Sequence, residues 1–206
     1  MATASQSLFN MTVASDNAGG NQGLLMPKLQ YRFRVNFLNF GIGSAIELTK
    51  QVIDCSRPNL SFAEITLPVY NSTMYLAGKH TWADMTCNIR DDASGNVSKS
   101  VGQQLQKQLD FVEQASAASG QDYKFQTNIE ILDGGNGASA PVVLETWELY
   151  GCWLKTANYD TLNYATNEAV KIALTIRFDN AIQSPLSSGV GTSVGRTLGS
   201  VATGIG

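Results

Sequence analysis

The sequence is poor in charge and in the side chains from which catalytic and metal sites are usually built. Only 15% of its 206 residues are charged, and it has one histidine and three cysteines. Ordinary soluble domains are about one quarter charged, so this composition favours a protein that covers much of its surface in an assembly. The formal net charge is −3 and Lys and Arg form no run, which argues against tight nucleic-acid binding, because phosphates are held by clustered cations.

The cysteines and the histidine form no readable metal, redox or cofactor motif. Cys55, Cys87 and Cys152 are widely spaced and no CxxC pair occurs, so reduced structural cysteines in a cytoplasmic setting are the favoured interpretation. One histidine cannot build a multi-histidine metal site, and the sequence contains no Walker A motif and no GxSxG elbow. We therefore expect no cofactor and no metal.

An active site would have to be built from His80, Asp84 and Asp91, and we expect these residues not to converge. His80 lies at the entrance of a predicted strand, where a surface or turn position is expected. Asp91 and Asp92 are adjacent, and adjacent strand residues point to opposite faces, so a role in a turn or in the approach to a helix is expected instead. The sequence therefore predicts that the protein is not an enzyme.

Long apolar runs are also missing. No window approaches the roughly 18 consecutive apolar residues of a membrane-spanning helix, and residues 1–20 lack the basic and apolar regions of a signal peptide. We expect neither a membrane span nor a secretory route. At this length the chain is expected to hold one domain with additional arms.

What the sequence does contain is a series of strands. Apolar and polar residues alternate over Tyr31–Phe37 and again over Val170–Asp179, which is the period-two pattern of half-buried strands. Further strands are predicted over Ile46–Ile53, from Phe125 to Ile131, and over Val142–Leu154.

One helix interrupts these strands, over about residues 98–118. It is predicted by an apolar stripe at helical spacing, made of Val101, Leu105, Leu109 and Val112. Strands, one helix and then strands again predict a mainly β domain, a β-sandwich or partly open barrel with one flanking α-helix. This domain is expected over residues 30–182, between an extended N-terminal arm at 1–29 and a Gly/Ser-rich C-terminal arm at 183–206.

The segment from Leu60 to Asp92 is the most informative part of the chain. It reads as three strands in succession: the first ends at Leu67-Pro68, the second covers Val69–Leu76 and, after a turn at Ala77-Gly78, the third covers Thr81–Arg90. Strands in series that carry no chemistry predict a protein that pairs its edges with copies of itself.

Four short motifs follow one another in this segment: Leu67-Pro68-Val69, Ala77-Gly78, Trp82-Ala83-Asp84 and Asp91-Asp92. This ordered series, with the strand before it and the helix after it, resembles the tail tube proteins of contractile-tailed bacteriophages. The resemblance covers roughly residues 30–180. No single residue is diagnostic, and the order and spacing of the motifs carry the match.

The resemblance implies a β-sandwich or barrel whose subunits form hexameric rings, stacked into a hollow tube inside a contractile sheath. Double-stranded DNA would pass through the lumen without specific binding. The sheath, tape-measure, baseplate and tail-terminator proteins would be partners. The location implied is the virion tail, after assembly in the cytoplasm of the bacterial host.

Two sets of contact residues follow from the same resemblance. The hairpin that would reach the adjacent ring contains Leu60, Phe62, Ile65, Leu67, Val69, Tyr70, Met74 and Leu76. The flanking helix, expected at ring contacts, contains Val101, Leu105, Leu109 and Val112. The two arms are expected to add contacts between rings or between tube and sheath.

Two alternative functions stay open at this point. One is the tube protein of a tailocin or of a type VI-like injection system, which moves no genome. The other is a small-ligand-binding β-barrel, which predicts a closed monomeric barrel around an apolar cavity. Capsid and terminase genes beside this gene would distinguish a phage tube from an injection-system tube.

Overall fold

The computed structural model describes residues 28–42, 46–133, 141–165, 167–185 and 190. Seven strands form the main sheet: β1 (Phe33–Leu38), β2 (Val52–Cys55), β5 (Met85–Arg90), β8 (Phe125–Leu132), β9 (Val143–Tyr159), β10 (Lys171–Arg177) and β11 (Asn180–Pro185). Two hairpins stand apart from it, β3 (Leu60–Val69) with β4 (Ser72–Trp82) and β6 (Leu109–Asp110) with β7 (Ala115–Ser116). The described residues contain the helices α1 (Ile46–Lys50), α2 (Asn96–Gln108) and α3 (Gly120–Tyr123).

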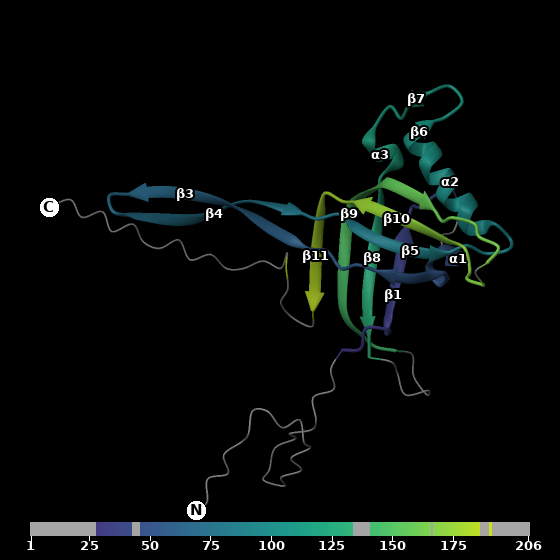
Figure 1. Cartoon of the computed structure of the whole chain (residues 1–206), viewed down its shortest axis with the longest axis horizontal. Helices are drawn as coiled ribbons and strands as arrows, with labels where there is room; N and C mark the ends of the chain where they lie inside the picture. The colour runs from purple at the N-terminus through teal and green to yellow at the C-terminus, as the bar shows by residue number, and fades with distance from the viewer. Residues whose placement is uncertain (1–27, 43–45, 134–140, 166, 186–189, 191–206) are drawn as a thin grey trace, which may run out of the picture.

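The main sheet folds over into a sandwich. Its strand order is β1-β8-β9-β10-β5-β2, with β11 also paired to β9. In Figure 1, β1, β8, β9 and β11 run down the page, whereas β10 and β5 run across it. The two end strands, β1 and β2, do not pair, so the sheet is not closed into a barrel. The predicted mainly β sandwich with a flanking helix is confirmed.

β9 belongs to both halves of the sandwich. Its first part pairs with β8 and β11, and its second part, from Trp153 onward, pairs with β10. A β-bulge lies between the two parts: Leu149 and Cys152 both face the core although two residues separate them, and Gly151 there has φ +67°. The bulge moves the inward-facing positions from odd-numbered to even-numbered residues and bends the strand.

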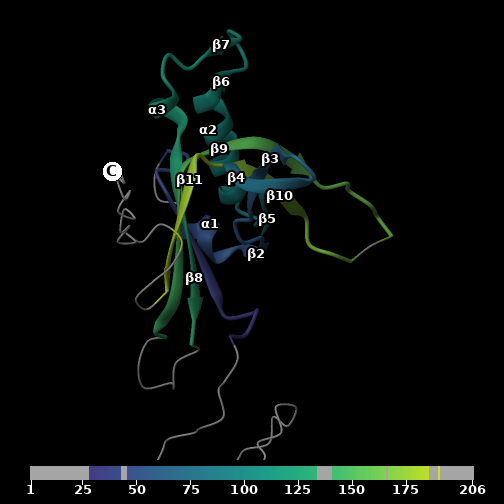
Figure 2. The same ribbon diagram turned by 90° about the vertical axis from the view of Figure 1, so that its left-hand side faces the viewer.

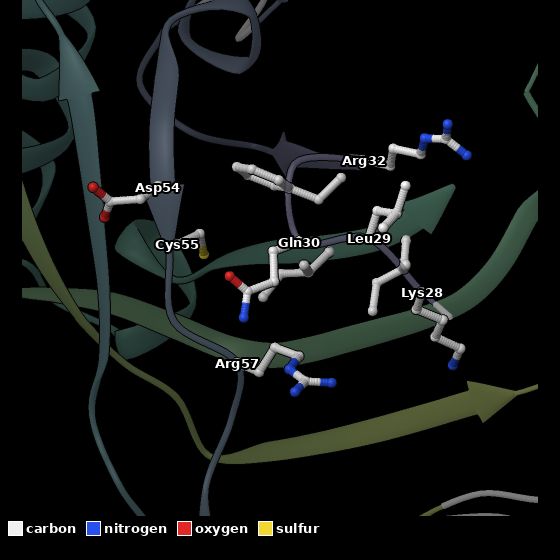
Figure 3. Close-up of a pocket in the computed structure, with 10 residues that line it drawn as sticks. Lys28, Leu29, Gln30, Arg32, Asp54, Cys55 and Arg57 are labelled. Carbon is white, nitrogen blue, oxygen red and sulfur yellow. The ribbon is translucent and has the colours of Figure 1, made fainter. Parts of the chain in front are cut away.

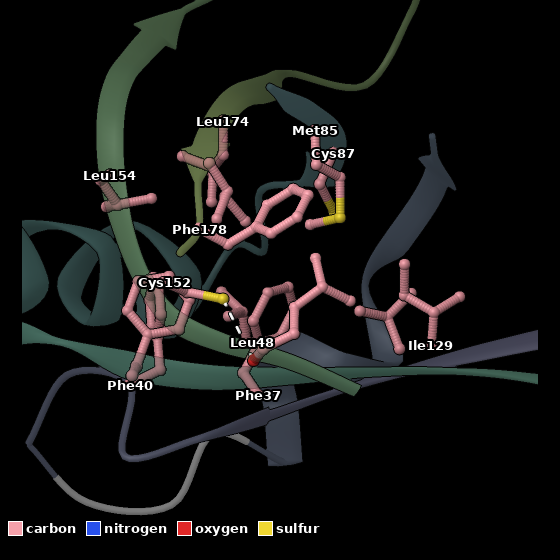
Figure 4. Packing of buried hydrophobic residues seen from close by; sticks show 14 of the residues in the cluster. Phe37, Phe40, Leu48, Met85, Cys87, Ile129, Cys152, Leu154, Leu174 and Phe178 are labelled. Carbon is pink, nitrogen blue, oxygen red and sulfur yellow. Dashed lines mark hydrogen bonds between the residues drawn. The ribbon is translucent and has the colours of Figure 1, made fainter. Parts of the chain in front are cut away.

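The core lies between the two halves, and Figure 4 shows side chains from both meeting there. The alternation predicted for the last long strand is confirmed, since Ile172, Leu174 and Ile176 of β10 are fully buried. From the other half, Phe37 packs against Phe40, and Phe40 packs edge-on against Phe125 with ring centroids 4.9 Å apart. The alternation of apolar residues along the strands therefore supplies most of the core.

The strand predicted over Ile46–Ile53 is only partly correct. Its first residues form α1, which buries Leu48, and β2 begins at Val52. A short run in which apolar and polar residues alternate does not distinguish a strand from one turn of helix. The structure also places the long strand predicted over Val142–Leu154 at Val143–Tyr159, five residues further at its end.

The flanking helix is present, but the prediction that it extends to residue 118 is wrong. α2 begins at Asn96 and ends at Gln108. The Asp110 carboxylate accepts hydrogen bonds from the backbone N–H groups of Val112, at 2.9 Å, and Glu113, at 3.3 Å. An aspartate that binds the backbone locally in this way competes with the helix and turns the chain.

Two members of the predicted helical stripe consequently lie outside the helix. Leu109 is in β6, and Val112 is 89% exposed in the turn that follows. Within α2, Val101 is fully buried in the core and Leu105 packs against the core. The four residues therefore do not form one surface, and Val101 serves the fold of its own subunit.

Two glutamines of α2 attach the helix to the sandwich. The buried Gln104 accepts a hydrogen bond from the Gly41 N–H at 3.0 Å and donates one to the Tyr123 carbonyl at 2.6 Å. Gln108 donates to the Leu154 carbonyl and accepts from the Leu154 N–H, both at 2.9 Å. The Gln108 amide thus takes the place of a neighbouring strand along the second part of β9, and satisfies backbone groups that would be costly to leave unpaired.

Most of the two predicted arms lies outside the described residues. The predicted boundary at residues 182 and 183 falls inside β11. None of the described helices is both long and apolar enough to cross a membrane.

We expect Gly151→Ala to lower the free energy of unfolding by about 1–3 kcal/mol, because its φ of +67° disfavours side chains and a Cβ there would overlap the Asp179 carboxylate. Gly102→Ala in α2 is the matched control. Nothing lies within 4 Å of its added Cβ, and alanine favours helix, so stability should rise by about 0.5–1 kcal/mol. Urea unfolding measures the free energy of unfolding of both variants. Equal changes in this free energy would contradict the role assigned to Gly151 in the bulge.

Candidate assembly interface

β3 and β4 form a hairpin that leaves the sandwich. Among the described strands each pairs only with the other. In Figure 1 the hairpin extends to the left while α1 and α2 lie at the right, and in Figure 2 it points toward the viewer. Every residue of β3 is exposed, and so is every residue of β4 except Gly78 and Trp82. The hairpin therefore offers both of its faces to another molecule.

The hairpin is longer than the sequence predicted, because Ala77-Gly78 is not a turn. The turn lies at Tyr70-Asn71, where the fully exposed Tyr70 has φ +34°. At Gly78 the pairing register shifts by one residue, which is a β-bulge in β4. A Cβ on Gly78 would lie 2.9 Å from the Ala63 carbonyl oxygen, so glycine permits the close approach of the two strands.

Five exposed apolar side chains share one face of the outer part of the hairpin. Ile65 pairs with Leu76, Leu67 pairs with Met74, and Val69 lies two positions further along β3. Residues paired across antiparallel strands point to the same side, and positions two apart share a face. We call this set the apolar face. Its members are each 42% to 54% exposed: Ile65, Leu67, Val69, Met74 and Leu76.

The remaining predicted contact residues lie elsewhere on the hairpin. Leu60 and Phe62 belong to the opposite face, close to the sandwich, and Tyr70 is at the tip. The outer part of that opposite face is mixed, because Thr66 and Thr73 lie on it together with the exposed Tyr75. The inter-ring role of all eight residues stays a prediction.

An aromatic series connects the base of the hairpin to the core. The Phe62 and His80 rings lie 6.3 Å apart, His80 and Trp82 also 6.3 Å, and Trp82 and Phe178 5.6 Å. Trp82 is only 5% exposed and Phe178 belongs to the core. His80 is thus an exposed strand residue engaged in ring contacts, which accords with the predicted surface position.

An ion-pair network around Asp84 holds the base of the hairpin. Asp84 accepts hydrogen bonds from Lys155 at 2.6 Å and from Arg177 at 2.8 Å, and Arg177 also donates to the Trp82 carbonyl at 2.7 Å. The pKa of Asp84 lies below its usual value, mainly because of the hydrogen bond from Lys155 and then because of the one from Arg177. Asp84 lies between β4 and β5, and the two cations come from β9 and β10, so the point where the hairpin departs is tied to two strands of the main sheet.

The three residues weighed as a catalytic set do not form one cleft. Asp84 and Asp91 flank the two ends of β5, a span of about 20 Å for six residues. Asp92 accepts a hydrogen bond from the Val97 N–H at 3.1 Å, so the predicted role in the approach to a helix is confirmed. Over the described ranges, no three or more His, Cys, Asp or Glu side chains gather as a metal site would require.

A groove of about 460 Å³ lies beside β2, β8 and the start of β1 (Figure 3). Cys55 reaches it from β2, and the cations Lys28, Arg32 and Arg57 line it together with Asp54. Apolar side chains such as Ile129 also line it. The closed barrel expected of a small-ligand carrier is absent, because the main sheet stays open.

The buried Glu145 of β9 anchors the first and last described parts of the chain. It accepts hydrogen bonds from Lys28, from Trp147 at 2.7 Å and from Gln183 of β11 at 2.8 Å. Burial raises the pKa of Glu145, but the hydrogen bonds from Lys28, Gln183 and Trp147 outweigh it and leave the pKa below its usual value. Lys28 and Gln183, from the two ends of the described chain, therefore meet at one carboxylate.

No protein-family model and no curated protein sequence matches the chain. Solved structures do match its fold. A chain of the anti-feeding prophage (AFP) tube-terminating cap gives a TM-score of 0.59 at 12% identity, covering 82% of this chain and 98% of that chain. A chain of the PVC sheath-tube complex, from an extracellular contractile injection system in its extended state, gives 0.57 at 14% identity, covering 79% and 95%. The chain has the fold of contractile-system tube proteins.

A chain of the six-fold symmetrised AFP baseplate matches this tube-protein fold as well, with a TM-score of 0.53 at 16% identity over 78% of this chain and 97% of that chain. The resemblance stated for the motifs between Leu67 and Asp92 is thereby confirmed at the level of fold. The sequence signal for the hairpin was a succession of predicted strands that carry no chemistry. The Asp84 network gave no signal, because Lys155 and Arg177 are distant in sequence.

We expect Asp84→Asn to lower the free energy of unfolding by about 1–2 kcal/mol, because two charge-assisted hydrogen bonds are weakened. The folded-state pKa of Asp84 is depressed. Its contribution is therefore present above the unfolded pKa of about 4 and is lost as the pH falls through the folded value. The difference between wild type and variant should shrink as the pH falls below about 4.

Chemical denaturation at pH 7 and at lower pH measures this difference. Glu168→Gln is the matched control, because the Glu168–Lys171 pair is exposed, with Glu168 75% accessible, and exposed pairs contribute roughly 0–1 kcal/mol. A pH-independent difference for Asp84→Asn would contradict the assigned ion pairs.

Proposed function

We propose that this protein is the tail tube subunit of a contractile-tailed bacteriophage. In this proposal six subunits form a ring, and the rings stack into a hollow conduit inside a contractile sheath. The observation that carries the proposal is the β3–β4 hairpin, which presents an apolar face outside the core of a tube-protein fold. The role is structural and includes no catalytic step.

The apolar face favours contact with another subunit. Covering a half-exposed Leu, Ile, Val or Met side chain contributes about 1 kcal/mol. The five side chains of the face then contribute roughly 5 kcal/mol per subunit, and six subunits roughly 30 kcal/mol per ring contact, before the costs of association. One hairpin therefore supports a weak contact, whereas a ring of hairpins supports a stable stack.

The partners proposed are the sheath, tape-measure, baseplate and tail-terminator proteins, with double-stranded DNA passing through the lumen. The similar solved chains come from assemblies named as a sheath-tube complex, a terminating cap and a six-fold symmetrised baseplate, which supports the sheath, terminator and baseplate partners and a six-fold ring. The low charge, with no run of Lys or Arg, suits a conduit along which DNA slides. The location proposed is the virion tail, assembled in the host cytoplasm.

A tube protein of a tailocin or other injection system is the second candidate. The observation that favours it is that the matching PVC structures belong to an extracellular contractile injection system. The two candidates share the ring and the stacked tube. They differ in cargo, so capsid and terminase genes beside this gene, or DNA inside purified particles, would favour the phage.

The purified protein is expected to form rings or tubes. Negative-stain electron microscopy and sedimentation velocity measure this directly, over a range of protein concentrations and salt conditions. A species that stays at the monomer mass of 22.1 kDa under all conditions would refute the proposed function.

We expect the double variant Leu67→Asp and Met74→Asp to abolish tube formation while leaving the fold intact. The two residues are paired across the hairpin and about half exposed, so charges there are solvated in the monomer but would be buried in a stack. The matched control is Thr66→Asp with Thr73→Asp, on the opposite face of the same strands. Electron microscopy measures assembly. The free energies of unfolding of the two double variants, measured with urea, should agree within about 0.5 kcal/mol. Equal loss of tubes in both variants would reject the apolar face as the contact surface.

A further inference from the structure

Cys55 and Cys87 lie directly opposite each other on neighbouring antiparallel strands, β2 and β5. At the next pair along, the Ser56 N–H donates to the Thr86 carbonyl at 2.9 Å, as in a hydrogen-bonded pair, while the Thr86 N–H donates to the Ser56 hydroxyl at 2.8 Å. The two kinds of pair alternate along an antiparallel ladder. The cysteines therefore form a non-hydrogen-bonded pair, in which the Cα atoms approach to about 4.5 Å.

This placement fits a disulfide bond. Disulfides join residues whose Cα atoms are about 4.4–6.8 Å apart, and residues paired across antiparallel strands direct their side chains to the same face. The Cys55 sulfur lies 3.7 Å from the sulfur of Met85, which is two positions from Cys87 on β5 and faces the same way. Both cysteines are present as free thiols.

The two thiols differ in access. Cys87 is fully buried, whereas Cys55 is half-buried and reaches the groove in Figure 3. The pKa of Cys87 is raised well above its usual value, chiefly by hydrogen bonding to the Cys55 side chain and secondly by burial. Cys55 is therefore the thiol that an external oxidant meets first. The groove beside it is lined by Lys28, Arg32 and Arg57 against the single carboxylate of Asp54, and this excess of cations favours an anionic oxidant.

We propose that Cys55 and Cys87 form a cross-strand disulfide when the protein meets a small disulfide such as glutathione disulfide. The Cys55 thiolate attacks one sulfur of the oxidant, and the first glutathione leaves as a thiolate that takes up a proton. Cys87 then loses its proton and attacks the Cys55 sulfur of the mixed disulfide, releasing the second glutathione. Two protein thiols are oxidised and one glutathione disulfide is reduced.

The bond would close the chain at the base of the projecting hairpin. The loop between the two cysteines contains β3 and β4 in full, and its neck is already joined by the Ala83 N–H donating to the Asn59 carbonyl at 2.9 Å. A disulfide there restricts the unfolded chain and ties the short edge strand β2 to β5. The hairpin would then be covalently clamped once the particle is outside a reducing cytoplasm.

The test uses the full-length protein, first reduced and then incubated with glutathione disulfide. We expect the intact mass to fall by two hydrogens, one thiol to remain for alkylation after denaturation, and peptide mapping to join the Cys55 and Cys87 peptides. Tm should rise by roughly 5 °C or more, and a thiol reductant should reverse the shift. Three persisting thiols, a bond that involves Cys152, or an unchanged Tm would each overturn the proposal.

Three variants separate the steps. Cys152→Ala should form the bond as the wild type does and leave no thiol for alkylation. Cys87→Ser should keep a stable glutathione adduct on Cys55, because the second thiol is missing. Cys55→Ser, at a half-buried position, should gain neither bond nor adduct; an adduct on Cys87 would contradict the assigned order of attack. These readouts do not depend on whether the protein forms tubes.

Discussion

The shared strand β9 is the constraint on which the rest of the structure depends. Its first part builds one half of the sandwich with β8 and β11, and its second part builds the other half with β10. A bulge bends this strand between the two sheets, and the positive φ of Gly151 is part of the bulge. The hairpin depends on this arrangement, because its base is held by Lys155 of β9 and Arg177 of β10.

A two-stranded hairpin is marginally stable in water when it stands alone. Here the sandwich supplies what the hairpin lacks, through the ring contacts that run from Phe62 to Phe178 and the ion pairs of Asp84. The outer parts of β3 and β4 therefore continue from a base that the sandwich already holds in place. A binding surface that is ordered in advance loses less conformational entropy on association than a loop that must fold on its partner. A contact of modest area per subunit is then sufficient when it is repeated around a ring.

The sequence predicted correctly the elements in which the apolar pattern is regular. It failed where a single residue produces a β-bulge or ends a helix. The alternation in β10 predicted its buried face because the strand is regular. The Ala77-Gly78 pair indicated a turn, since glycine is common both in turns and in bulges, and cross-strand contact alone distinguishes them. The helix appeared too long because Leu109 and Val112 continue the apolar spacing, whereas the Asp110 carboxylate ends the helix through local hydrogen bonds. Pairings distant in sequence, such as Asp84 with Arg177, leave no local pattern.

The hairpin also carries few of the devices that keep exposed strands from pairing indiscriminately. Such strands are usually protected by charges, proline or bulges, and between Leu60 and Trp82 the only acidic or basic side chains besides His80 are Glu64 and Lys79. Pro68 removes one backbone donor from β3, and the Gly78 bulge breaks the regularity of β4. These two features limit the length over which another strand can add to the hairpin edges, while the apolar face stays open. Addition of a strand at the hairpin edges is therefore restricted in length, whereas association through the apolar face is not.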